Sequence, residues 1–496
     1  MTDSYDLLVI GGGINGAGIA RDAAGRGLKV LLVEKDDLAS HTSSASTKLV
    51  HGGLRYLEHY EFRLVAESLR EREVLLRSAP HIIWPLRFVM PYEPSMRPKW
   101  MLRLGLALYD RIGGRTSLPK SRSVDLRIAP HRNTLQGRLK SGFEYSDCWV
   151  EDSRLVVLTA KDAEERGAEI RVRTKCTGLE RNASDWTAHL RCGAGVRSVT
   201  AQAVVNAAGP FVDRVAATAL GQGTPAHLRL VKGSHIILSR RFAGDHAYIF
   251  QQRDGRIVFA LPYERDFTLI GTTDLLYEGD LDDVVISPEE IAYLIEAASR
   301  YFSSAITEDE IVSSYSGVRP LYEDHAASNS TVTRDYVFEL DNEGGAPILS
   351  VYGGKITTYR KLAEHALEKL GRVLALPGKA WTADAPLPGG DMPDGDFAAF
   401  LWRISERYEW LPPEMLLRLA RAYGTRIEAV IGSAGSLGEL GAHMGGNLYE
   451  AELRYLFDAE YARTAQDVLW RRSKLGLHLP VGAQQAVADW FAAQTS

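Results

Sequence analysis

The beginning of the chain alternates short apolar runs with a stretch of small residues. Residues 6–10 form an apolar run that stops at three glycines, and a second run, residues 29–33, ends at Glu34. Runs of this length that stop at glycine favour buried strands over pieces of helix. Residues 14–24, between the two runs, carry small and apolar side chains at helical spacing. The pattern therefore predicts a strand, a helix and a second strand.

Further along the chain the pattern changes several times. Residues 39–56 are rich in Ser, Thr and Gly, and a long loop of this kind is usually functional or disordered. Residues 61–79 return to helical spacing, whereas residues 229–275 alternate with a period of two, which predicts an antiparallel sheet. Residues 346–353 predict another strand. From residue 396 to the end, Leu, Ala, Arg and Glu recur at helical spacing, which predicts a helical domain.

The composition is that of an ordinary soluble globular protein. Of the 496 residues, 45% are hydrophobic and 24% are charged, and at ~150 residues a domain this length suggests about three domains. The formal net charge of -5 gives no overall field that would attract nucleic acid, so any basic site is local. Three cysteines without a CxxC pair exclude a disulfide framework, and we expect no metal site.

The sequence also bears on location. The N-terminus is acidic where a signal peptide would carry Lys or Arg, and no apolar run reaches the ~18 residues of a membrane span. We expect a cytoplasmic protein that can still attach to a membrane surface. Residues 96–111 combine cations with Trp100, Leu104 and Tyr109, as an interfacial helix does. A helix packed on its own core fits this segment equally well, so both interpretations stay open.

A glycine motif lies between the first predicted strand and the helix. In Gly11-x-Gly13-x-x-Gly16, the first glycine allows a tight turn, the second lets backbone approach a pyrophosphate, and the third lets the helix pack on the sheet. Glu34, at the end of the second strand, is placed to accept hydrogen bonds from ribose hydroxyls, and its charge disfavours NADP. Strand, helix and terminal acid together predict a dinucleotide site.

The motif alone does not separate FAD from NAD, but two further features favour FAD. The loop after Glu34 contains Ser43, Ser44 and Lys48, and it is long enough to follow the rest of an extended cofactor. A later turn, residues 206–210, includes Gly209 and offers small residues for a second close approach of backbone to the cofactor. We assign these residues to the cofactor site.

Several segments resemble the FAD-dependent glycerol-3-phosphate dehydrogenases. They are GGGINGAG (11–18), SSASTKLVHGGLRY (43–56), GFEYSDCWV (142–150), KGSH (232–235), YSGVRP (315–320) and GGKITTYR (353–360). The resemblance is greatest to the respiratory, membrane-associated bacterial enzymes. It implies FAD as the cofactor, oxidation of sn-glycerol 3-phosphate to dihydroxyacetone phosphate, and transfer of the electrons to a membrane quinone.

The resemblance also implies a fold that combines α/β and α+β architecture. We expect a Rossmann-type FAD-binding domain, a substrate domain with a mixed or antiparallel sheet, and a C-terminal all-helical domain. The expected boundaries are 1–80, 140–225 and 345–385 for the FAD-binding domain, 81–139 and 226–344 for the substrate domain, and 390–496 for the helical domain. A homodimer is compatible with the sequence, which does not give the oligomeric state.

The implied substrate is a small diol with a phosphate dianion, and holding it needs cations with directed donors. Each charge-assisted hydrogen bond contributes ~1.5–3 kcal/mol. Arg55, Arg319 and Lys355 are the candidates, because glycines close to them leave room for a ligand. Arg334 is a further candidate, although a solvated surface charge fits it equally well. Tyr56 is a candidate to orient a substrate oxygen through its hydroxyl group.

The implied chemistry moves a hydride from C2 to flavin N5 while the C2 hydroxyl loses a proton. His51 and His235 are the candidate bases, since histidine titrates near neutral pH. Nearby positive charge from Lys48 and Arg55 would lower the pKa of His51, whereas a purely structural role is a serious alternative for His235. Arg319 would also stabilise the developing alkoxide.

Residues 353–360 predict a strand end, a glycine turn and a helix start. Gly354 allows the turn, and Thr357 and Thr358 are suitable residues to cap the helix. Together with Lys355, the backbone N–H groups of this helix start would stabilise an anionic reduced flavin at N1–C2=O.

Two other functions stay open at this point. An FAD oxidase acting on amines, amino acids or glycerol 3-phosphate would also need arginine, although several cations around small residues favour a phosphate dianion. Residues 210–350 lack the long insertion that is common in oxidases of this family. A regulatory dinucleotide-binding protein would have no need to retain His51, Arg55, Arg319 and Lys355 together.

Overall fold

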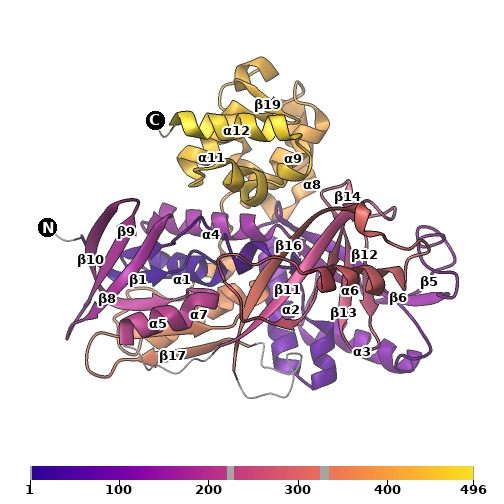
Figure 1. Cartoon of the computed structure of the whole chain (residues 1–496), viewed down its shortest axis with the longest axis horizontal. Helices are drawn as coiled ribbons and strands as arrows, with labels where there is room; N and C mark the ends of the chain where they lie inside the picture. The colour runs from indigo at the N-terminus through magenta and orange to yellow at the C-terminus, as the bar shows by residue number, and fades with distance from the viewer. Residues whose placement is uncertain (1–2, 221–227, 324–334, 495–496) are drawn as a thin grey trace.

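The computed structural model describes residues 3–220, 228–323 and 335–494. Two large sheets form the body of the molecule, and a C-terminal helical unit, yellow in Figure 1, lies on one side of that body. The fold class expected from the sequence is confirmed, with one small exception described below for the C-terminal unit.

The first sheet is built on the strand–helix–strand unit that the sequence predicts. β1 (Asp3–Ile10) pairs in parallel with β2 (Val30–Val33) and with β10 (Gly195–Asn206), and α1 (Ile14–Gly25) connects β1 to β2. Its other strands are β7 (Glu169–Arg171), β8 (Thr174–Arg181), β9 (Trp186–Cys192), β17 (Val337–Asp341) and β18 (Ile348–Tyr352). The carboxyl ends of β1, β2 and β10 therefore meet at one edge, where sheets of this kind bind nucleotides.

Helices cover this sheet closely because small residues let them approach. α1 packs against α4 (Asp152–Glu165) and α7 (Tyr359–Leu370), and α5 (Val212–Leu220) packs against β8 and β10. A Cβ atom at Gly18 would lie 2.8 Å from the Tyr359 ring, so this glycine sets how closely α1 and α7 can pack.

The second sheet is antiparallel except for one parallel pair, β4 with β12. Its strands are β3 (Leu49–Val50), β4 (Ile83–Pro91), β5 (Arg122–Asp125), β6 (Ser141–Val150), β11 (Leu228–Ser239), β12 (Ala247–Gln251), β13 (Ile257–Tyr263), β14 (Phe267–Gly271), β15 (Leu275–Leu276) and β16 (Ile311–Tyr322). The antiparallel pairing of β11, β13 and β14 confirms the prediction from the period-two pattern of residues 229–275.

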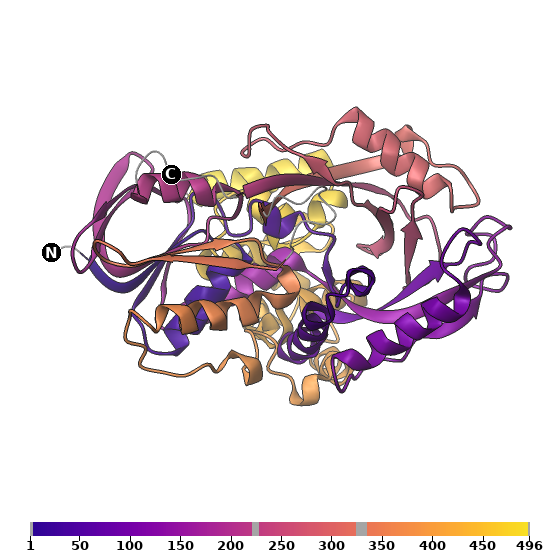
Figure 2. The same ribbon diagram turned by 90° about the horizontal axis from the view of Figure 1, so that it is seen from below.

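Alternating side chains give this sheet two buried faces. Ile237 belongs to a core shared with α2 (Phe62–Ser78) and α3 (Lys99–Ile112), whereas its neighbour Ile236 packs with α6 (Pro288–Ser299). Successive strand residues point to opposite faces, so α3 and α6 lie on opposite sides of the sheet (Figure 2).

The expected domain segments divide several strands differently from the sheets, and β3, within 1–80, pairs with β6 of the second sheet. β6 lies within the segment 140–225 that we assigned to the FAD-binding domain, yet it pairs with β4 of the second sheet. β17 lies within the segment 226–344, yet it pairs with β18 of the first sheet. The period of a strand shows that it is a strand but does not show which partner it takes.

The C-terminal unit has its own hydrophobic core. Its helices are α8 (Phe397–Arg407), α9 (Pro413–Tyr423), α10 (Ile427–Ile431), α11 (Glu450–Ala459) and α12 (Val481–Gln494), with a π-helix at Asp467–Arg472. The expectation of an all-helical domain is wrong in one detail, because β19 (His443–Gly445) and β20 (Leu448–Tyr449) form a small hairpin.

Candidate active site

The carboxyl edge of the first sheet opens into a cavity of about 440 Å³. Five residues that the sequence assigned to the cofactor line this cavity: Gly11, Gly13, Glu34, Ser43 and Gly209. The structure therefore brings the glycine motif, the acid after β2 and the later turn to one place.

The glycine motif allows backbone segments to touch at the start of this cavity. Gly11 has a φ of +114°, and a Cβ atom there would lie 2.5 Å from the carbonyl oxygen of Ala207. A Cβ atom at Gly16 would lie 1.9 Å from the carbonyl oxygen of Gly11, so the third glycine lets α1 pack against the turn. Any side chain at either position would push α1 away from β1 and β10.

Two side chains in this cavity are held at the positions where a dinucleotide would meet them. The Glu34 carboxylate accepts hydrogen bonds from the backbone N–H groups of Gly12 (2.7 Å) and Asp36 (2.9 Å), which fix it at the end of β2. Burial raises the pKa of Glu34, and the two backbone donors oppose that shift. At the N-terminus of α1, the N–H group of Ile14 donates to Ser43 Oγ at 3.0 Å, so an oxygen already lies where a phosphate oxygen would bind.

Lys48, which the sequence also assigned to the cofactor, is not among the residues that line this cavity. Its ammonium group is buried, lies 2.9 Å from an Asp152 carboxylate oxygen and donates to the carbonyl oxygen of Ser44 at 3.0 Å. The hydroxyl group of Ser46 also donates to Asp152, at 2.8 Å. Lys48 and Asp152 thus hold the loop that contains Ser43 and Ser44 in shape.

A second group of residues lies where the loop after β3 meets the turn after β18. Lys355 Nζ is 3.9 Å from the centre of the Tyr56 ring, and the backbone N–H group of His51 donates to Thr357 Oγ1 at 3.2 Å. Gly354 has a φ of +94°. Five residues that the sequence assigned to substrate, catalysis or cofactor therefore lie together.

This group adjoins the start of α1. Asn15 donates from its side chain to the carbonyl oxygen of Gly353 at 3.1 Å, and a Cβ atom at Gly354 would lie 3.0 Å from Asn15 Nδ2. The expected side-chain caps of α7 are absent, since Thr358 makes no capping hydrogen bond and Thr357 instead accepts from His51. A 3-10 helix, Ile356–Thr358, leads into α7 in their place.

Arg319 lies on β16, opposite Val231 of β11. One guanidinium nitrogen donates to the carbonyl oxygen of Thr273 at 2.8 Å and lies 3.3 Å from Asp274 Oδ1. Gly233 leaves space for this group, because a Cβ atom there would lie 2.8 Å from Arg319 Nη2. The pairing of β16 with β11 and the hydrogen bond to Thr273 therefore fix the position of the guanidinium group.

His235 is buried on β11, where its ring contacts Tyr315 and the loop at Thr47. Its ring stacks on Tyr315 with centres 4.7 Å apart, and Nε2 lies 3.0 Å from Thr47 Oγ1. Burial, followed by the charges of Lys48 and Arg319, lowers the pKa of His235 well below its usual range. His235 is therefore a neutral histidine that fixes the loop at Thr47.

Hydrogen bonds attach this loop to β16. The Tyr315 hydroxyl donates to the carbonyl oxygen of Ser46 at 2.8 Å, and the Thr42 hydroxyl donates to the carbonyl oxygen of Val318 at 2.6 Å. The loop that bears the cofactor residues and the strand that bears Arg319 thus form one connected unit.

One of the two remaining substrate candidates lies elsewhere. Arg55 lines a cavity of about 230 Å³ between the 3-10 helix Leu54–His59, α3 and the second sheet, although the next residue, Tyr56, contacts Lys355. Arg334 lies outside the described residues.

Sequence reasoning missed Asn15, Thr47, Asp152 and Tyr315. Asn15, Thr47 and Tyr315 each lie inside a segment that carried the family resemblance, so their motifs were visible although their contacts were not. Asp152 had no such signal, because its partner Lys48 is 104 residues away in the chain.

The chain matches two family models. Residues 6–360 match the FAD dependent oxidoreductase family, and residues 380–495 match the C-terminal domain of alpha-glycerophosphate oxidase.

Curated relatives match over nearly the whole chain. A glycerol-3-phosphate dehydrogenase of Pseudomonas aeruginosa is 51% identical over 99% of this chain and 96% of the relative. The aerobic glycerol-3-phosphate dehydrogenase of Escherichia coli is 48% identical over 99% of this chain and 98% of the relative. A D-erythritol 1-phosphate dehydrogenase of Brucella abortus is 50% identical over 99% of this chain and 98% of the relative.

Solved structures agree with these matches. The glycerol-3-phosphate dehydrogenase of Bacillus halodurans, solved as a complex with FAD, has a TM-score of 0.80 and 29% identity, covering 99% of this chain and 90% of that one. A glycine oxidase of Geobacillus kaustophilus shares the fold with a TM-score of 0.57 at 20% identity, over 77% of this chain and 99% of that one.

Proposed function

Because the chain belongs to the FAD-dependent glycerol-3-phosphate dehydrogenases, a family of FAD-dependent oxidoreductases, we propose that it oxidises sn-glycerol 3-phosphate to dihydroxyacetone phosphate and passes the electrons to a membrane quinone. The observation that carries the proposal is the convergence of Lys355, Tyr56 and His51 beside the start of α1. A cation and a titratable group beside the helix that starts at the glycine motif suit a phosphorylated alcohol.

The cations serve the substrate in two ways. Arg319 has a planar guanidinium that suits paired phosphate or alkoxide oxygens, whereas the Lys355 ammonium is a compact charge on a flexible stem. The face of Tyr56 contacts Lys355 and limits where that charge can go. Bound FAD supplies the acceptor for the hydride that leaves C2.

We assign the proton from the C2 hydroxyl to His51 rather than to His235. His235 has its Nε2 beside Thr47, and its lowered pKa makes it a weak base. The backbone of His51 is anchored to Thr357, which fixes the residue between the loop after β3 and the turn after β18. A general base needs a fixed position within hydrogen-bond reach of its proton.

We further propose that α3 rests on the cytoplasmic membrane surface. Trp100 is 66% exposed and Leu104 63% exposed, with Leu108 one turn further, so an apolar stripe faces outward. Tyr60, directly after the 3-10 helix Leu54–His59 that packs against α3, is 80% exposed. Within the described residues, no helix is both long and apolar enough to cross a membrane.

The cavity beneath α3 offers a place for a quinone to approach. Its walls are mainly apolar and include Met101, Leu106 and Ile249, and Arg55 supplies hydrogen-bond donors. It lies beside the 3-10 helix that carries Tyr56, so a quinone there would be between the membrane-facing helix and the substrate residues.

Two alternatives follow from particular findings. The relative named D-erythritol 1-phosphate dehydrogenase makes a longer polyol phosphate the second candidate substrate, since it presents the same phosphate and a secondary alcohol. The C-terminal family model is named after an oxidase, which makes oxygen the second candidate acceptor.

Anaerobic titration of the purified yellow protein tests these choices together. Glycerol 3-phosphate is expected to bleach the oxidised flavin band, whereas glycerol is not, and erythritol 1-phosphate in a matched cuvette ranks the two phosphates. Addition of a quinone is then expected to restore the band faster than air does. An intact band with every substrate would overturn the proposal, and faster recovery in air would identify an oxidase. Sedimentation equilibrium in detergent would test whether the protein forms the homodimer that the sequence allows.

A further inference from the structure

We propose that the C-terminal helical unit is a clamp for FAD. Its Arg471 and Arg472 hold Asp37, and through it the loop that carries the ribose-binding Glu34. The inference rests on the cofactor being FAD and not on which substrate the enzyme oxidises.

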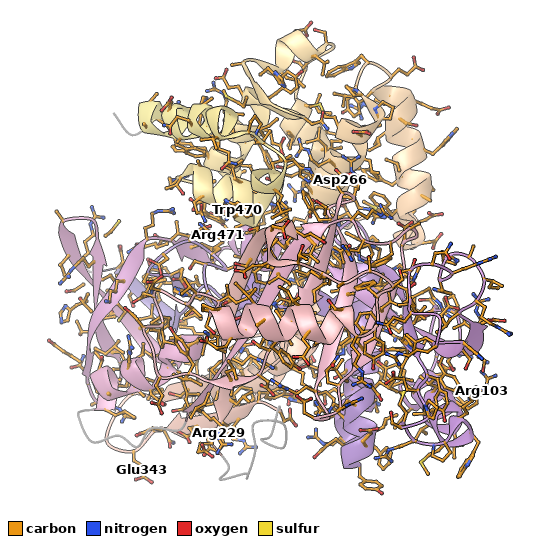
Figure 3. The ribbon with its side chains drawn as sticks, turned by 45° about the vertical axis from the view of Figure 1, so that its right-hand side comes forward. Arg103, Arg229, Asp266, Glu343, Trp470 and Arg471 are labelled. Carbon is orange, nitrogen blue, oxygen red and sulfur yellow. The ribbon has the colours of Figure 1, made fainter. Side chains whose placement is uncertain are left out.

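The Asp37 carboxylate is bound by two arginines, and both belong to the C-terminal unit. Arg472 makes a two-pronged contact with the carboxylate, with Nη1 2.6 Å from one oxygen and Nη2 2.8 Å from the other. Arg471 adds a third hydrogen bond through Nε at 2.6 Å. The side chains of Arg472 and Asp37 are 0% and 1% exposed, so solvent does not compete for these bonds. In Figure 3, Arg471 and Trp470 lie on the side of the C-terminal unit that faces the body of the molecule.

The π-helix Asp467–Arg472 explains how two adjacent arginines reach one carboxylate. Neighbouring residues on an α-helix point about 100° apart, whereas a wider π-turn changes this spacing locally. Arg472 also donates through Nε to the carbonyl oxygen of Glu460 at 3.0 Å, which fixes its position from the opposite side. The π-helix and the Glu460 carbonyl therefore hold the arginine side chains in position to bind Asp37.

Asp37 is attached to the cofactor cavity on both sides along the chain. On one side, the Asp36 backbone N–H group donates to Glu34, the cavity-lining acid. On the other side, the N–H group of Ala39 donates to the carbonyl oxygen of Gly12 at 3.1 Å, within the glycine motif. A Cβ atom at Gly12 would also lie 2.9 Å from Leu38. Movement of Asp37 would therefore move residues that line the cavity.

A second contact from the same π-helix reaches this loop through Arg173. Arg173 Nη2 lies 2.7 Å from Asp467, and its backbone N–H group donates to the carbonyl oxygen of Asp36 at 2.7 Å. The next residue, Thr174, donates its N–H group to the carbonyl oxygen of Glu34 at 2.7 Å. The C-terminal unit thus holds the loop after β2 directly at Asp37 and indirectly through β8.

A third contact supports the loop that carries Ser43 and Ser44. Arg154 at the start of α4 lies 2.9 Å from the Glu460 carboxylate, and Lys474 donates to Ser153 at 3.3 Å. The adjacent Asp152 holds Lys48 of that loop. Both loops that border the dinucleotide cavity are therefore braced by the C-terminal unit, and a binding site ordered before its ligand arrives loses less entropy on binding.

The test measures how long flavin stays on the holoenzyme, without any substrate. Holoenzymes of the parent, Arg472→Gln and Asp37→Asn are diluted, and the flavin that remains bound is followed by gel filtration over time. The matched control is Arg418→Gln, which breaks an ion pair (2.7 Å to Glu452) inside the C-terminal unit. We expect the first two variants to release FAD at least tenfold faster than the parent, and the control to release it within twofold.

A second measurement separates positioning from simple loss of stability. The rise in Tm that FAD gives to the apoprotein is expected to shrink in Arg472→Gln and Asp37→Asn, to recover partly in Arg472→Lys, and to stay unchanged in Arg418→Gln. If Arg472→Gln does not fold, Arg471→Gln replaces it, because Arg471 is 13% exposed and shares the same carboxylate. Release within twofold of the parent in Asp37→Asn and in either arginine variant would overturn the proposal.

Discussion

A phosphate dianion is recognised by single side chains that carry a permanent charge at a fixed position. The Arg319 guanidinium is held by the carbonyl oxygen of Thr273 and lies near Asp274, and the Lys355 ammonium lies over the Tyr56 ring. These anchors keep the charges in place before substrate arrives, so each cation should contribute a separable part of substrate recognition.

Replacing either cation with methionine tests this. Each charge-assisted hydrogen bond contributes ~1.5–3 kcal/mol, so Arg319→Met and Lys355→Met should each lower kcat/KM for glycerol 3-phosphate by about 10- to 100-fold. Steady-state kinetics with glycerol as a second substrate provide the control, since glycerol carries no phosphate and its slow turnover should change less. Unchanged kcat/KM in both variants would exclude these residues from the substrate site.

The two histidines are expected to separate in their kinetics. A general base contributes ~10²–10⁴-fold, so His51→Gln should lower kcat by that factor and remove the acidic limb of the pH profile. His235→Gln is the matched variant, and it should cost less than about tenfold because an amide can still bond to Thr47. The opposite order of the two effects in pH-dependent kinetics would assign the base to His235.

A third histidine, His81, is expected to make the folding stability depend on pH. It is fully buried, neither ring nitrogen has a hydrogen-bond partner among the described residues, and burial lowers its pKa to about 3. Between pH 6.5 and 3 the unfolded chain binds a proton at His81 that the folded protein does not, so folding stability falls as pH falls.

The expected loss from His81 is about 1.4 kcal/mol for each pH unit below its unfolded pKa of about 6.5. Urea unfolding of the parent and of His81→Gln between pH 7.5 and 5 measures this slope. The variant should lose stability less steeply with acid than the parent, although it starts lower. Parallel slopes would show that His81 binds its proton in the folded state.

The sequence predicted the identity of many site residues but not their partners. Gly11, Gly16 and Glu34 were readable because backbone geometry and ribose binding demand those residue types at that spacing. The contact of Lys48 could not be predicted, because its partner Asp152 is 104 residues away in the chain and is brought close only by the fold. The lowered pKa of His235 was also not visible in the sequence, since it depends on burial and on Lys48 and Arg319, which lie far from His235 in the chain.

At the scale of elements, α3 has one buried face and one exposed apolar face. Leu106 and Tyr109 are buried against the second sheet, whereas Trp100, Leu104 and Leu108 are exposed. The buried face agrees with a helix packed on its own core, and the exposed face is the one that we propose to contact lipid. The hydrophobic period predicted the helix, but only the packing shows that its apolar surface exceeds what its own core needs.

Reversing the charges on α3 should weaken attachment to anionic lipid. Each cation near such a surface contributes ~1 kcal/mol, so Lys99→Glu combined with Arg103→Glu should lower vesicle binding by at least about tenfold. Lys99 already contacts Ser141 and the Tyr92 ring, so Arg103 is expected to give the larger share. Sedimentation with anionic liposomes measures the effect, and equal sedimentation of parent and variant would remove α3 as the membrane face.

At the scale of the whole molecule, α3 and the C-terminal unit lie on opposite sides of the catalytic body (Figure 1). A protein that rests on lipid through α3 therefore points the C-terminal unit away from the membrane. This arrangement separates the proposed tasks, with acceptor access at α3 and retention of FAD at the C-terminal unit. The sequence indicated both segments, but their positions depend on how the second sheet folds between them.

The α3 variant therefore should separate two activities of one enzyme. Reduction of a soluble dye needs only the substrate site, whereas reduction of a quinone in vesicles also needs the molecule on the membrane, so only the second activity should fall, by about the loss in vesicle binding. Arg454→Glu on α11, in the C-terminal unit, is the matched charge reversal and should change neither activity. Because α3 packs against the 3-10 helix that carries Tyr56, an equal fall in both activities would mean that α3 supports the substrate site rather than the contact with lipid.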